Sequence, residues 1–249
     1  MCGICGEIGF ERAADVGAVG AMAASLAPRG PDAQGLLARD RVAFGHRRLK
    51  IIDLSAKAEQ PMTDPELGLS IVFNGCIYNY PELRRELEGK GYRFFSTGDT
   101  EVMLKAYHAW GLDFPKRLHG MFAFAIHERE SGRVVLGRDR FGIKPLYLAE
   151  TDGALRFASS LPALVAAGGI DTTLDPEALA FYMTWHAVVP APWTILKGVR
   201  KLPPATLRVV EPDGRTKDHV FWDLSFERTP EDIETPREVW RERVLAALE

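Results

Sequence analysis

The chain opens with Met1-Cys2-Gly3-Ile4-Cys5-Gly6-Glu7-Ile8-Gly9-Phe10. The spacing of the apolar side chains in this stretch predicts a β-strand, with a thiol at its start. Removal of Met1 would leave Cys2 with both a thiol and a free α-amine. Since an α-amine has an ordinary pKa of roughly 7.7 to 8.0, it can act as a base for the thiol on the same residue. The stretch therefore predicts an N-terminal nucleophile.

Cys2 and Cys5 also form a C-x-x-C pair, a spacing found in zinc sites and in redox disulfides. The only other cysteine is Cys76, so thiols alone cannot complete a four-ligand zinc site. On a strand, positions three apart point to opposite faces. We therefore expect no metal site here. A further alternative makes Cys2 a buried apolar residue at the chain end, and residues further along argue against it.

The composition describes an ordinary globular protein. The 249 residues are 46% hydrophobic and 26% charged, with a formal net charge of −3. This near-neutral balance gives no reason to expect a nucleic acid or a membrane as partner. No apolar run approaches the roughly 20 residues that cross a bilayer, and the N-terminus does not look like a secretory signal. Three cysteines fit a reducing compartment, so we expect a cytoplasmic location.

Short strands and amphipathic helices alternate without strict βαβ order, which indicates an α+β fold. The patterns predict helices at 15–26, 80–90, 99–110 and 176–183 and from 237 onward. They predict strands at 42–44, 50–53, 70–75, 76–78, 120–127, 133–138, 146–150, 155–158, 206–210 and 217–222. Asn74-Gly75 predicts a tight turn between two of these strands, and Asp99 is expected to be a helix N-cap. The stretch 120–127 is apolar on both faces, so it should lie deep between layers.

Several motifs follow one another along residues 1–210 in an order that resembles a known family. They are Met1-Cys2-Gly3-Ile4, Arg29-Gly30-Pro31-Asp32, Gly45-His46-Arg47-Arg48-Leu49 with Ile52-Asp53, Gln60-Pro61-Met62, Phe73-Asn74-Gly75, Tyr78-Asn79, Gly98-Asp99-Thr100-Glu101-Val102, Gly120-Met121-Phe122-Ala123-Phe124 and Gly137-Arg138-Asp139-Arg140-Phe141-Gly142-Ile143-Lys144-Pro145-Leu146. The chain resembles the glutaminase domain of class II glutamine amidotransferases, in the asparagine-synthetase-like branch.

The resemblance implies a four-layer αββα sandwich of the N-terminal nucleophile hydrolase type, with two antiparallel sheets face to face between helices. It implies a glutamine amidotransferase domain over residues 1–210. Residues 211–249 would then be a linker and the first helix leading to an ATP-dependent synthetase domain that is absent from this chain. The Ser-Gly-Gly-x-Asp-Ser loop of such a domain does not occur in the sequence.

The resemblance also implies roles for five residues. Cys2 would attack the side-chain amide of glutamine, and Asn74 and Gly75 would form the oxyanion hole. Arg48 would bind the glutamine α-carboxylate, and Asp99 would hold the α-ammonium. No metal or cofactor is expected for this half of the reaction, whereas ATP and Mg²⁺ are implied for the missing synthetase domain.

Each of these residues has an ordinary structural alternative. Asn74-Gly75 could be a simple turn, Arg48 a solvated surface charge and Asp99 a helix cap. All of these would have to coincide in a chain that also begins with Met-Cys, and that coincidence favours a glutaminase site.

The chain departs from the family pattern at Cys76 and Ser160, where glutamate is usual, and at Ala205, where glycine is usual. This pattern is most similar to N-acetylglutaminylglutamine amide synthases. The predicted function is therefore to supply ammonia for ATP-dependent amidation of N-acetylglutaminylglutamine. The glutaminase domain of an asparagine synthetase is an alternative, and so is a catalytically weak glutamine-binding domain, which Cys76 favours.

A hydrolase of some other amide is a third alternative. Arg48 and Asp99 argue against it, because together they match the two charges of a free amino acid. The expected partners are glutamine and the missing synthetase domain, and a homodimer is left open. The chain alone should hydrolyse glutamine without transferring ammonia, and its terminal helix should pack poorly because its apolar stripe lacks a partner.

Overall fold

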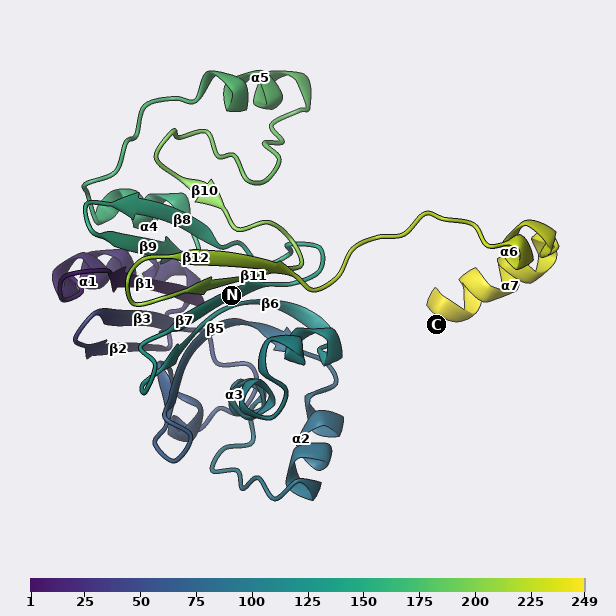
Figure 1. Cartoon of the computed structure of the whole chain (residues 1–249), viewed down its shortest axis with the longest axis horizontal. Helices are drawn as coiled ribbons and strands as arrows, with labels where there is room; N and C mark the ends of the chain where they lie inside the picture. Colours follow the sequence, from purple (N-terminus) through teal and green to yellow (C-terminus); the bar gives the residue numbers. More distant parts are fainter. Residues whose placement is uncertain (249) are drawn as a thin grey trace.

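Two antiparallel six-stranded sheets lie face to face in the computed structural model, which describes residues 1–248 (Figure 1). The first sheet has the order β10-β8-β9-β1-β3-β2. Its strands are β1 (Gly3–Gly9), β2 (Ala33–Arg39), β3 (Val42–Arg48), β8 (Tyr147–Thr151), β9 (Ala154–Ala158) and β10 (Arg200–Lys201). The strand that follows Cys2 is therefore central, paired with β3 on one side and β9 on the other.

The second sheet has the order β12-β11-β7-β6-β5-β4. Its strands are β4 (Met62–Asp64), β5 (Leu69–Ile77), β6 (Gly120–Glu128), β7 (Val134–Arg138), β11 (Thr206–Val210) and β12 (Thr216–Val220). Strands were predicted at the places of β11 and β12, which pair as a hairpin and continue this sheet to Val220. The expected domain boundary at residue 210 falls inside that hairpin.

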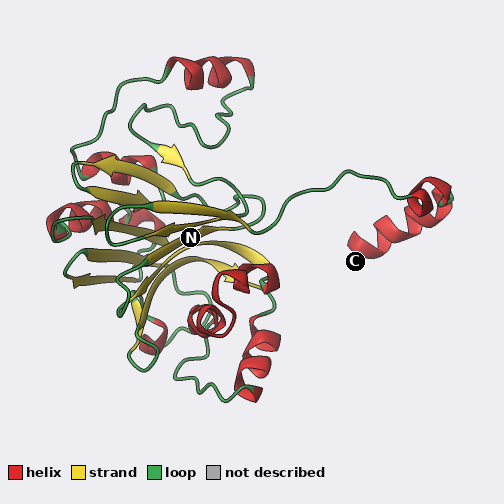
Figure 2. Ribbon diagram, viewed as in Figure 1, coloured by secondary structure: helices red, strands yellow, loops and turns green. Residues whose placement is uncertain are grey.

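Helices cover the outer face of each sheet, which gives the predicted αββα layers (Figure 2). Against the first sheet lie α1 (Val16–Ser25) and α4 (Leu161–Ala166). On the far side of the second sheet lie α2 (Tyr80–Gly89) and α3 (Asp99–Trp110), followed by the 3₁₀ turn Gly111–Arg117. The remaining helices are α5 (Pro176–Thr184), α6 (Pro230–Glu234) and α7 (Arg237–Leu248).

Three apolar cores separate these four layers. The middle core joins the two sheets and includes Ile4, Phe44 and Phe157. The strand β6 contributes to two cores, because Phe122 and Phe124 pack toward the helices while Ala123 and Ala125 face the other sheet. This explains why 120–127 is apolar on both faces, as the sequence predicted.

Three local predictions are wrong. Asn74-Gly75 is not a turn, because β5 pairs with β6 without interruption from Leu69 to Ile77. Residues 50–53 form no strand, since the chain leaves the sheet after Arg48 and loops around that side chain. Asp99 is the first residue of α3 rather than its N-cap, which is Gly98.

Two segments extend away from the sandwich in Figure 1, namely the arm that carries α5 and the tail that carries α6 and α7. No residue of α7 is buried, and the apolar stripe remains exposed at Val239, Trp240, Val244, Leu245 and Leu248. The prediction that the terminal helix packs poorly is confirmed. Within residues 1–248, we find no helix whose length and hydropathy would allow it to cross a bilayer.

Candidate active site

Cys2 lies just before β1, at the end of the sandwich where β3 and β5 also end. Its Sγ accepts a hydrogen bond from the backbone N–H of Leu49 at 3.4 Å, and its carbonyl oxygen accepts one from Nε of Arg29 at 3.2 Å. Cys5 points to the opposite face, where it packs under α1, and burial raises the pKa of its thiol to about 12. Only the first thiol of the C-x-x-C pair is therefore placed to react.

A cavity of about 180 Å³ opens beside Cys2. All five residues to which the resemblance assigns roles line this cavity, together with Met1, Leu49, Ile51, Ile52, Ala58, Gln60, Phe73, Cys76, Gly98, Thr100, Met121 and Lys144. They come from segments far apart in the sequence: the chain start, the end of β3, the end of β5 and the start of α3.

Arg48 ends β3 and is only 4% exposed, so it is not a solvated surface charge. Its two terminal nitrogens donate to the backbone carbonyls of Ser55, at 2.9 Å, and Asp53. A guanidinium has five N–H donors in a fixed fork. Arg48 is therefore held in place by backbone oxygens while it keeps donors for a planar two-oxygen anion at the cavity wall.

Asn74 and Gly75 lie in β5, opposite Ala123 and Phe122 of β6. The Asn74 side chain is 1% exposed, and its Nδ2 has no hydrogen-bond partner within residues 1–248. A buried amide nitrogen in that state costs roughly 1 to 3 kcal/mol. A Cβ at Gly75 would lie 2.3 Å from the carbonyl oxygen of Met121, so only glycine fits this close approach of β5 to β6. The sequence missed this reason for the glycine and assigned it to a turn.

Asp99 begins α3 and is 5% exposed. Its Oδ2 accepts the backbone N–H of Ile77 at 3.1 Å, which ties the start of α3 to the end of β5. Burial raises the pKa of Asp99 to about 6, against the effect of its backbone hydrogen bonds. Because burial disfavours the ionised form of this carboxylate, a cation bound beside it would stabilise that form.

Cys76 and Lys144 are two further ionisable side chains that line this cavity. Burial, and then the carboxylate of Asp99, raise the pKa of the half-buried Cys76 thiol, while Lys144 lowers it. Lys144 donates to the Sδ of Met1 at 3.3 Å. The loop that presents Lys144 is folded around Asp139, whose carboxylate accepts the N–H groups of Ile143 and Lys144 at 2.9 Å each.

The sequence reasoning missed Lys144 and Arg29 as residues beside Cys2. Both lie within motifs that it quoted, so the signal was present. What was lacking was the proximity of residues 29 and 144 to residue 2, which only the tertiary structure supplies.

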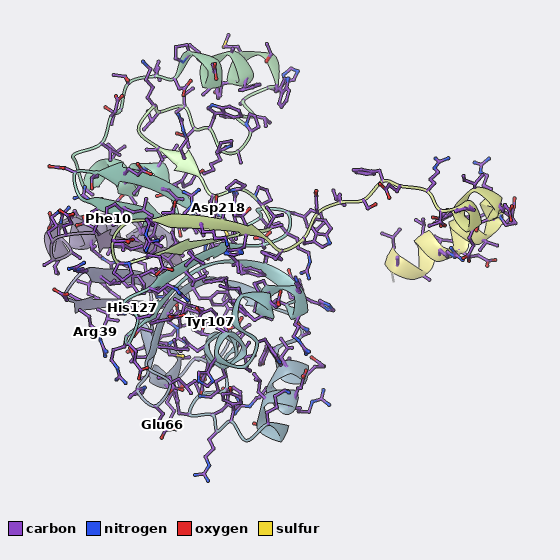
Figure 3. The ribbon with its side chains drawn as sticks, viewed as in Figure 1. Phe10, Arg39, Glu66, Tyr107, His127 and Asp218 are labelled. Carbon is purple, nitrogen blue, oxygen red and sulfur yellow. The ribbon has the colours of Figure 1, made fainter. Side chains whose placement is uncertain are left out.

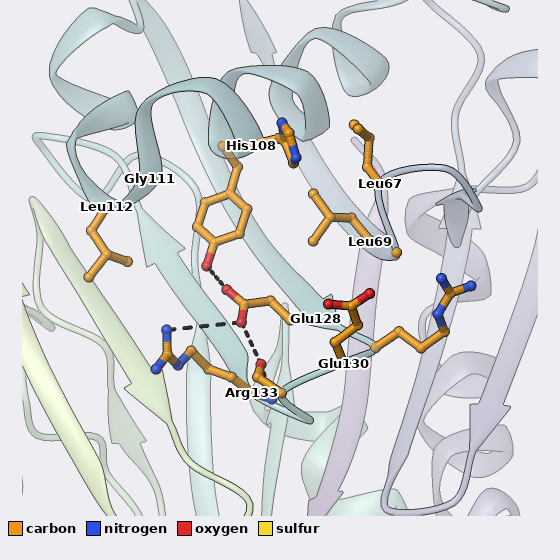
Figure 4. Close-up of a pocket in the computed structure, with 12 residues that line it drawn as sticks. Leu67, Leu69, His108, Gly111, Leu112, Glu128, Glu130 and Arg133 are labelled. Atoms are coloured by element: carbon orange, nitrogen blue, oxygen red, sulfur yellow. Dashed lines mark hydrogen bonds and ion pairs between the residues drawn. The ribbon is translucent and has the colours of Figure 1, made fainter.

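A larger hollow of about 450 Å³ lies at the other end of β5, near Leu69 (Figure 4). It is lined by Leu67, Leu69, His108, Leu112, Glu128, Arg133 and others. The carboxylate of Glu128 is already engaged there by the hydroxyl groups of Tyr107 and Ser131 and by Arg133. This hollow contains no cysteine, so the Cys2 cavity is the better candidate for covalent chemistry. His127 and Arg39, labelled in Figure 3, line a further pocket that shares Arg129, Glu130 and Ser131 with this hollow.

Comparisons with known proteins show which family this chain resembles. A family model described as a glutamine amidotransferase domain matches residues 1–222. The asparagine synthetase [glutamine-hydrolyzing] 1 of Bacillus subtilis is 40% identical over 206 residues, which are 82% of this chain and 32% of that protein. The amidase chry2 of Gibberella zeae is 32% identical over 229 residues, which are 90% of this chain and 33% of that protein. The chain thus spans about a third of the length of these two curated relatives.

Among solved structures, the glutamine phosphoribosylpyrophosphate amidotransferase of B. subtilis aligns with a TM-score of 0.66. The alignment covers 89% of this chain and 49% of that one, at 18% sequence identity. This likeness concerns the fold alone, and it confirms the predicted sandwich of two antiparallel sheets.

Proposed function

Because this chain belongs to the glutamine amidotransferase domain family, we propose that it hydrolyses the side-chain amide of glutamine with Cys2 as nucleophile. It is a class II glutamine amidotransferase domain of the asparagine-synthetase type. The observation that carries the residue assignment is the unpartnered Nδ2 of Asn74, buried at the cavity that Cys2 also lines. A buried donor without a partner destabilises the folded protein, and a hydrogen bond to an oxyanion would offset that cost.

The proposed reaction begins with the Cys2 α-amine, freed by removal of Met1, taking the thiol proton. The thiolate sulfur bonds to the amide carbon, and the carbonyl electron pair moves to oxygen. Nδ2 of Asn74 and the backbone N–H of Gly75 stabilise that oxyanion, for which one such donor typically lowers the barrier by ~2.7 to 4 kcal/mol. The C–N bond then breaks, and the α-ammonium protonates the departing nitrogen. Water cleaves the thioester, which releases glutamate and restores the thiol.

The free amino-acid end of glutamine would bind between Arg48 and Asp99. Arg48 offers a fork of donors to the α-carboxylate, and Asp99 offers a carboxylate to the α-ammonium. Both side chains are buried at the wall of the same cavity, so each charge of the substrate would meet an opposite charge out of bulk solvent.

For the whole protein, we propose that the ammonia amidates N-acetylglutaminylglutamine in a synthetase domain that uses ATP and Mg²⁺. The support is that this chain spans only about a third of the length of curated relatives, and that Cys76, Ser160 and Ala205 depart from the usual family residues. Residues 1–210 would be the glutaminase domain, and residues 211–249 would lead to the synthetase domain and place the exposed stripe of α7 against it. We propose a cytoplasmic location.

A glutamine-mimicking diazoketone tests the nucleophile. It should add one equivalent of mass to the peptide that holds Cys2 and abolish glutamate release, and Cys2→Ala should block both. Cys5→Ala is the matched control and should still be labelled. Label on Cys5 or Cys76, together with glutamate release by Cys2→Ala, would contradict the assignment.

A second experiment tests the separation of the two half-reactions. The purified chain, given glutamine, ATP, Mg²⁺ and either aspartate or an acetylated glutamine dipeptide, should yield glutamate and free ammonia without AMP. Formation of AMP or of an amidated product would place a synthetase site in this chain.

A further inference from the structure

The loop after β3 wraps around the guanidinium of Arg48. One terminal nitrogen donates to the carbonyl oxygen of Ser55 at 2.9 Å, and the other donates to the carbonyl oxygen of Asp53. These contacts use two of the five guanidinium donors. The place of the guanidinium therefore depends on where the backbone of residues 53 and 55 is held.

The side chain of Asp53 stabilises this loop through hydrogen bonds. Asp53 has a φ of 48°, in the left-handed region that Asp tolerates better than most side chains. Its Oδ1 accepts the N–H of Ser55 at 3.0 Å and the Ser55 hydroxyl at 2.6 Å, while its Oδ2 accepts the N–H of Thr97 at 2.7 Å. Although burial raises the pKa of Asp53, the hydrogen bonds from Ser55 and Thr97 hold it well below its usual range.

Thr97 leads directly into the start of α3. Gly98 caps that helix and Asp99 is its first residue. A Cβ on Gly98 would lie 3.4 Å from the Cβ of Asp53, so there is room for little more than a methyl group between the two loops. Within residues 1–248, Asp53 and Thr97 are the only residue pair whose hydrogen bond joins residues 49–55 to residues 95–99.

We propose that Asp53 is a positioning residue that sets the spacing between Arg48 and Asp99. The inference rests on the proposed function, in which these two side chains bind the α-carboxylate and α-ammonium of one glutamine molecule. Both substrate charges are attached to the same carbon atom, so the two binding groups must keep a fixed separation. Asp53 accepts a hydrogen bond from Arg48 through its backbone carbonyl oxygen. Its carboxylate accepts one from Thr97, in the loop that leads to Asp99.

Asp53→Asn tests this role while keeping the size of the side chain. An amide has one acceptor oxygen, so it cannot satisfy the N–H groups of both Ser55 and Thr97, and its NH₂ would face a donor. We expect the KM for glutamine to rise about tenfold or more, as for loss of one hydrogen bond to a charged acceptor, with kcat changed less than about threefold. The ratio of kcat/KM for glutamine to kcat/KM for glutaramate, which lacks the α-ammonium, should also fall.

Asp32→Asn is the matched control. Its carboxylate accepts the N–H of Lys50 at 2.8 Å, on the same loop, and within residues 1–248 it has no hydrogen bond to residues 95–99. This variant should have the wild-type KM for glutamine and the wild-type preference for glutamine over glutaramate. If Asp53→Asn also keeps both, or if the two variants change them equally, Asp53 does not set the spacing. A fall in kcat and in melting temperature with unchanged selectivity would point to a merely structural role and would overturn the proposal.

Calorimetry in a Cys2→Ala background separates this inference from the proposed function. That background binds glutamine without turnover, so the Kd should rise about tenfold or more when Asp53→Asn is added. If the Cys2→Ala background itself releases glutamate, the nucleophile assignment fails, and the change in KM when Asp53→Asn is added then tests the positioning role. Equal Kd values with and without Asp53→Asn would refute the positioning role while leaving the nucleophile assignment standing.

Discussion

Replacing Asp99 by Asn should make the protein more stable at neutral pH while it destroys glutamine binding. Asp99 is buried, and burial raises its pKa from 3.8 to about 6. A rise of that size corresponds to roughly 3 kcal/mol against folding once the carboxylate is ionised. An Asn oxygen can still accept the N–H of Ile77, so the main contact of this side chain survives the change.

The magnitude follows from two opposing effects. At the start of α3 the negative charge gains roughly 0.3 to 1 kcal/mol from the helix dipole, and Asn forfeits that gain. The net stabilisation at pH 7.5 is therefore about 2 kcal/mol. Proton binding gives the direction in which stability changes with pH. Between pH 4 and 6 the folded protein binds more protons than the unfolded chain. The free energy of unfolding of the wild type therefore falls relative to that of the variant as pH rises. At pH 4.5 the advantage of the variant should fall to about 1 kcal/mol, because the folded carboxyl is then protonated while that of the unfolded chain is largely ionised.

Urea unfolding followed by tryptophan fluorescence at pH 4.5 and 7.5 measures both quantities. Asp113→Asn, which removes an exposed carboxylate, is the control and should show no such gap at either pH. Glutamine should raise the urea midpoint of the wild type and leave that of Asp99→Asn unchanged. A variant that is no more stable than wild type at pH 7.5, or a gap that does not change with pH, would refute the reasoning.

Three further substitutions have definite expected outcomes. Cys76→Glu should lower the KM for glutamine with little change in kcat, because a carboxylate beside Asp99 adds a charge-assisted contact of ~1.5 to 3 kcal/mol to the substrate ammonium; steady-state kinetics measure this. Ala205→Gly should stabilise the fold by about 1 kcal/mol in urea unfolding, since Ala205 has a φ of 51°. Glu7→Gln should cost about 3 kcal/mol or more in the same assay, since it leaves the buried Arg156 without its carboxylate partner at 2.6 Å.

Each of these has an outcome that would count against it. An unchanged KM for Cys76→Glu would mean that position 76 does not face the substrate ammonium. A less stable Ala205→Gly would show that the left-handed backbone there is unstrained, and a small loss for Glu7→Gln would show that Arg156 finds another partner.

The sequence predicted the layers of the fold better than it predicted local turns. Helix α3 begins and ends where its periodicity and Gly111 indicate, because those signals are local. The strand β5 was divided in error, since Asn-Gly is a strong turn signal in isolation. Its pairing with β6 through Asn74 and Gly75 is a tertiary effect that no local pattern reveals. The short helix α4 was missed, and at six residues it offers little periodicity to detect.

For the candidate site, the resemblance named residues and the structure supplied their partners. Cys2, Arg48, Asn74, Gly75 and Asp99 line one cavity, which the sequence could only imply. The backbone groups that hold them could not be predicted, because they belong to loops with no regular pattern. The carbonyl groups around Arg48 and the N–H of Leu49 beside the Cys2 thiol are such cases.

Met1 lines the same cavity and contacts Lys144 through its thioether, so its side chain forms part of the wall that a bound glutamine would meet. Under the proposed mechanism, a chain that retains Met1 would resemble a zymogen, latent until an aminopeptidase has acted. One cleavage would both free the amine proposed as the base and remove Met1 from the cavity wall. A preparation in which overexpression outpaces the aminopeptidase would be a mixture, and titration of its reactive thiols would count fewer active sites than protein molecules.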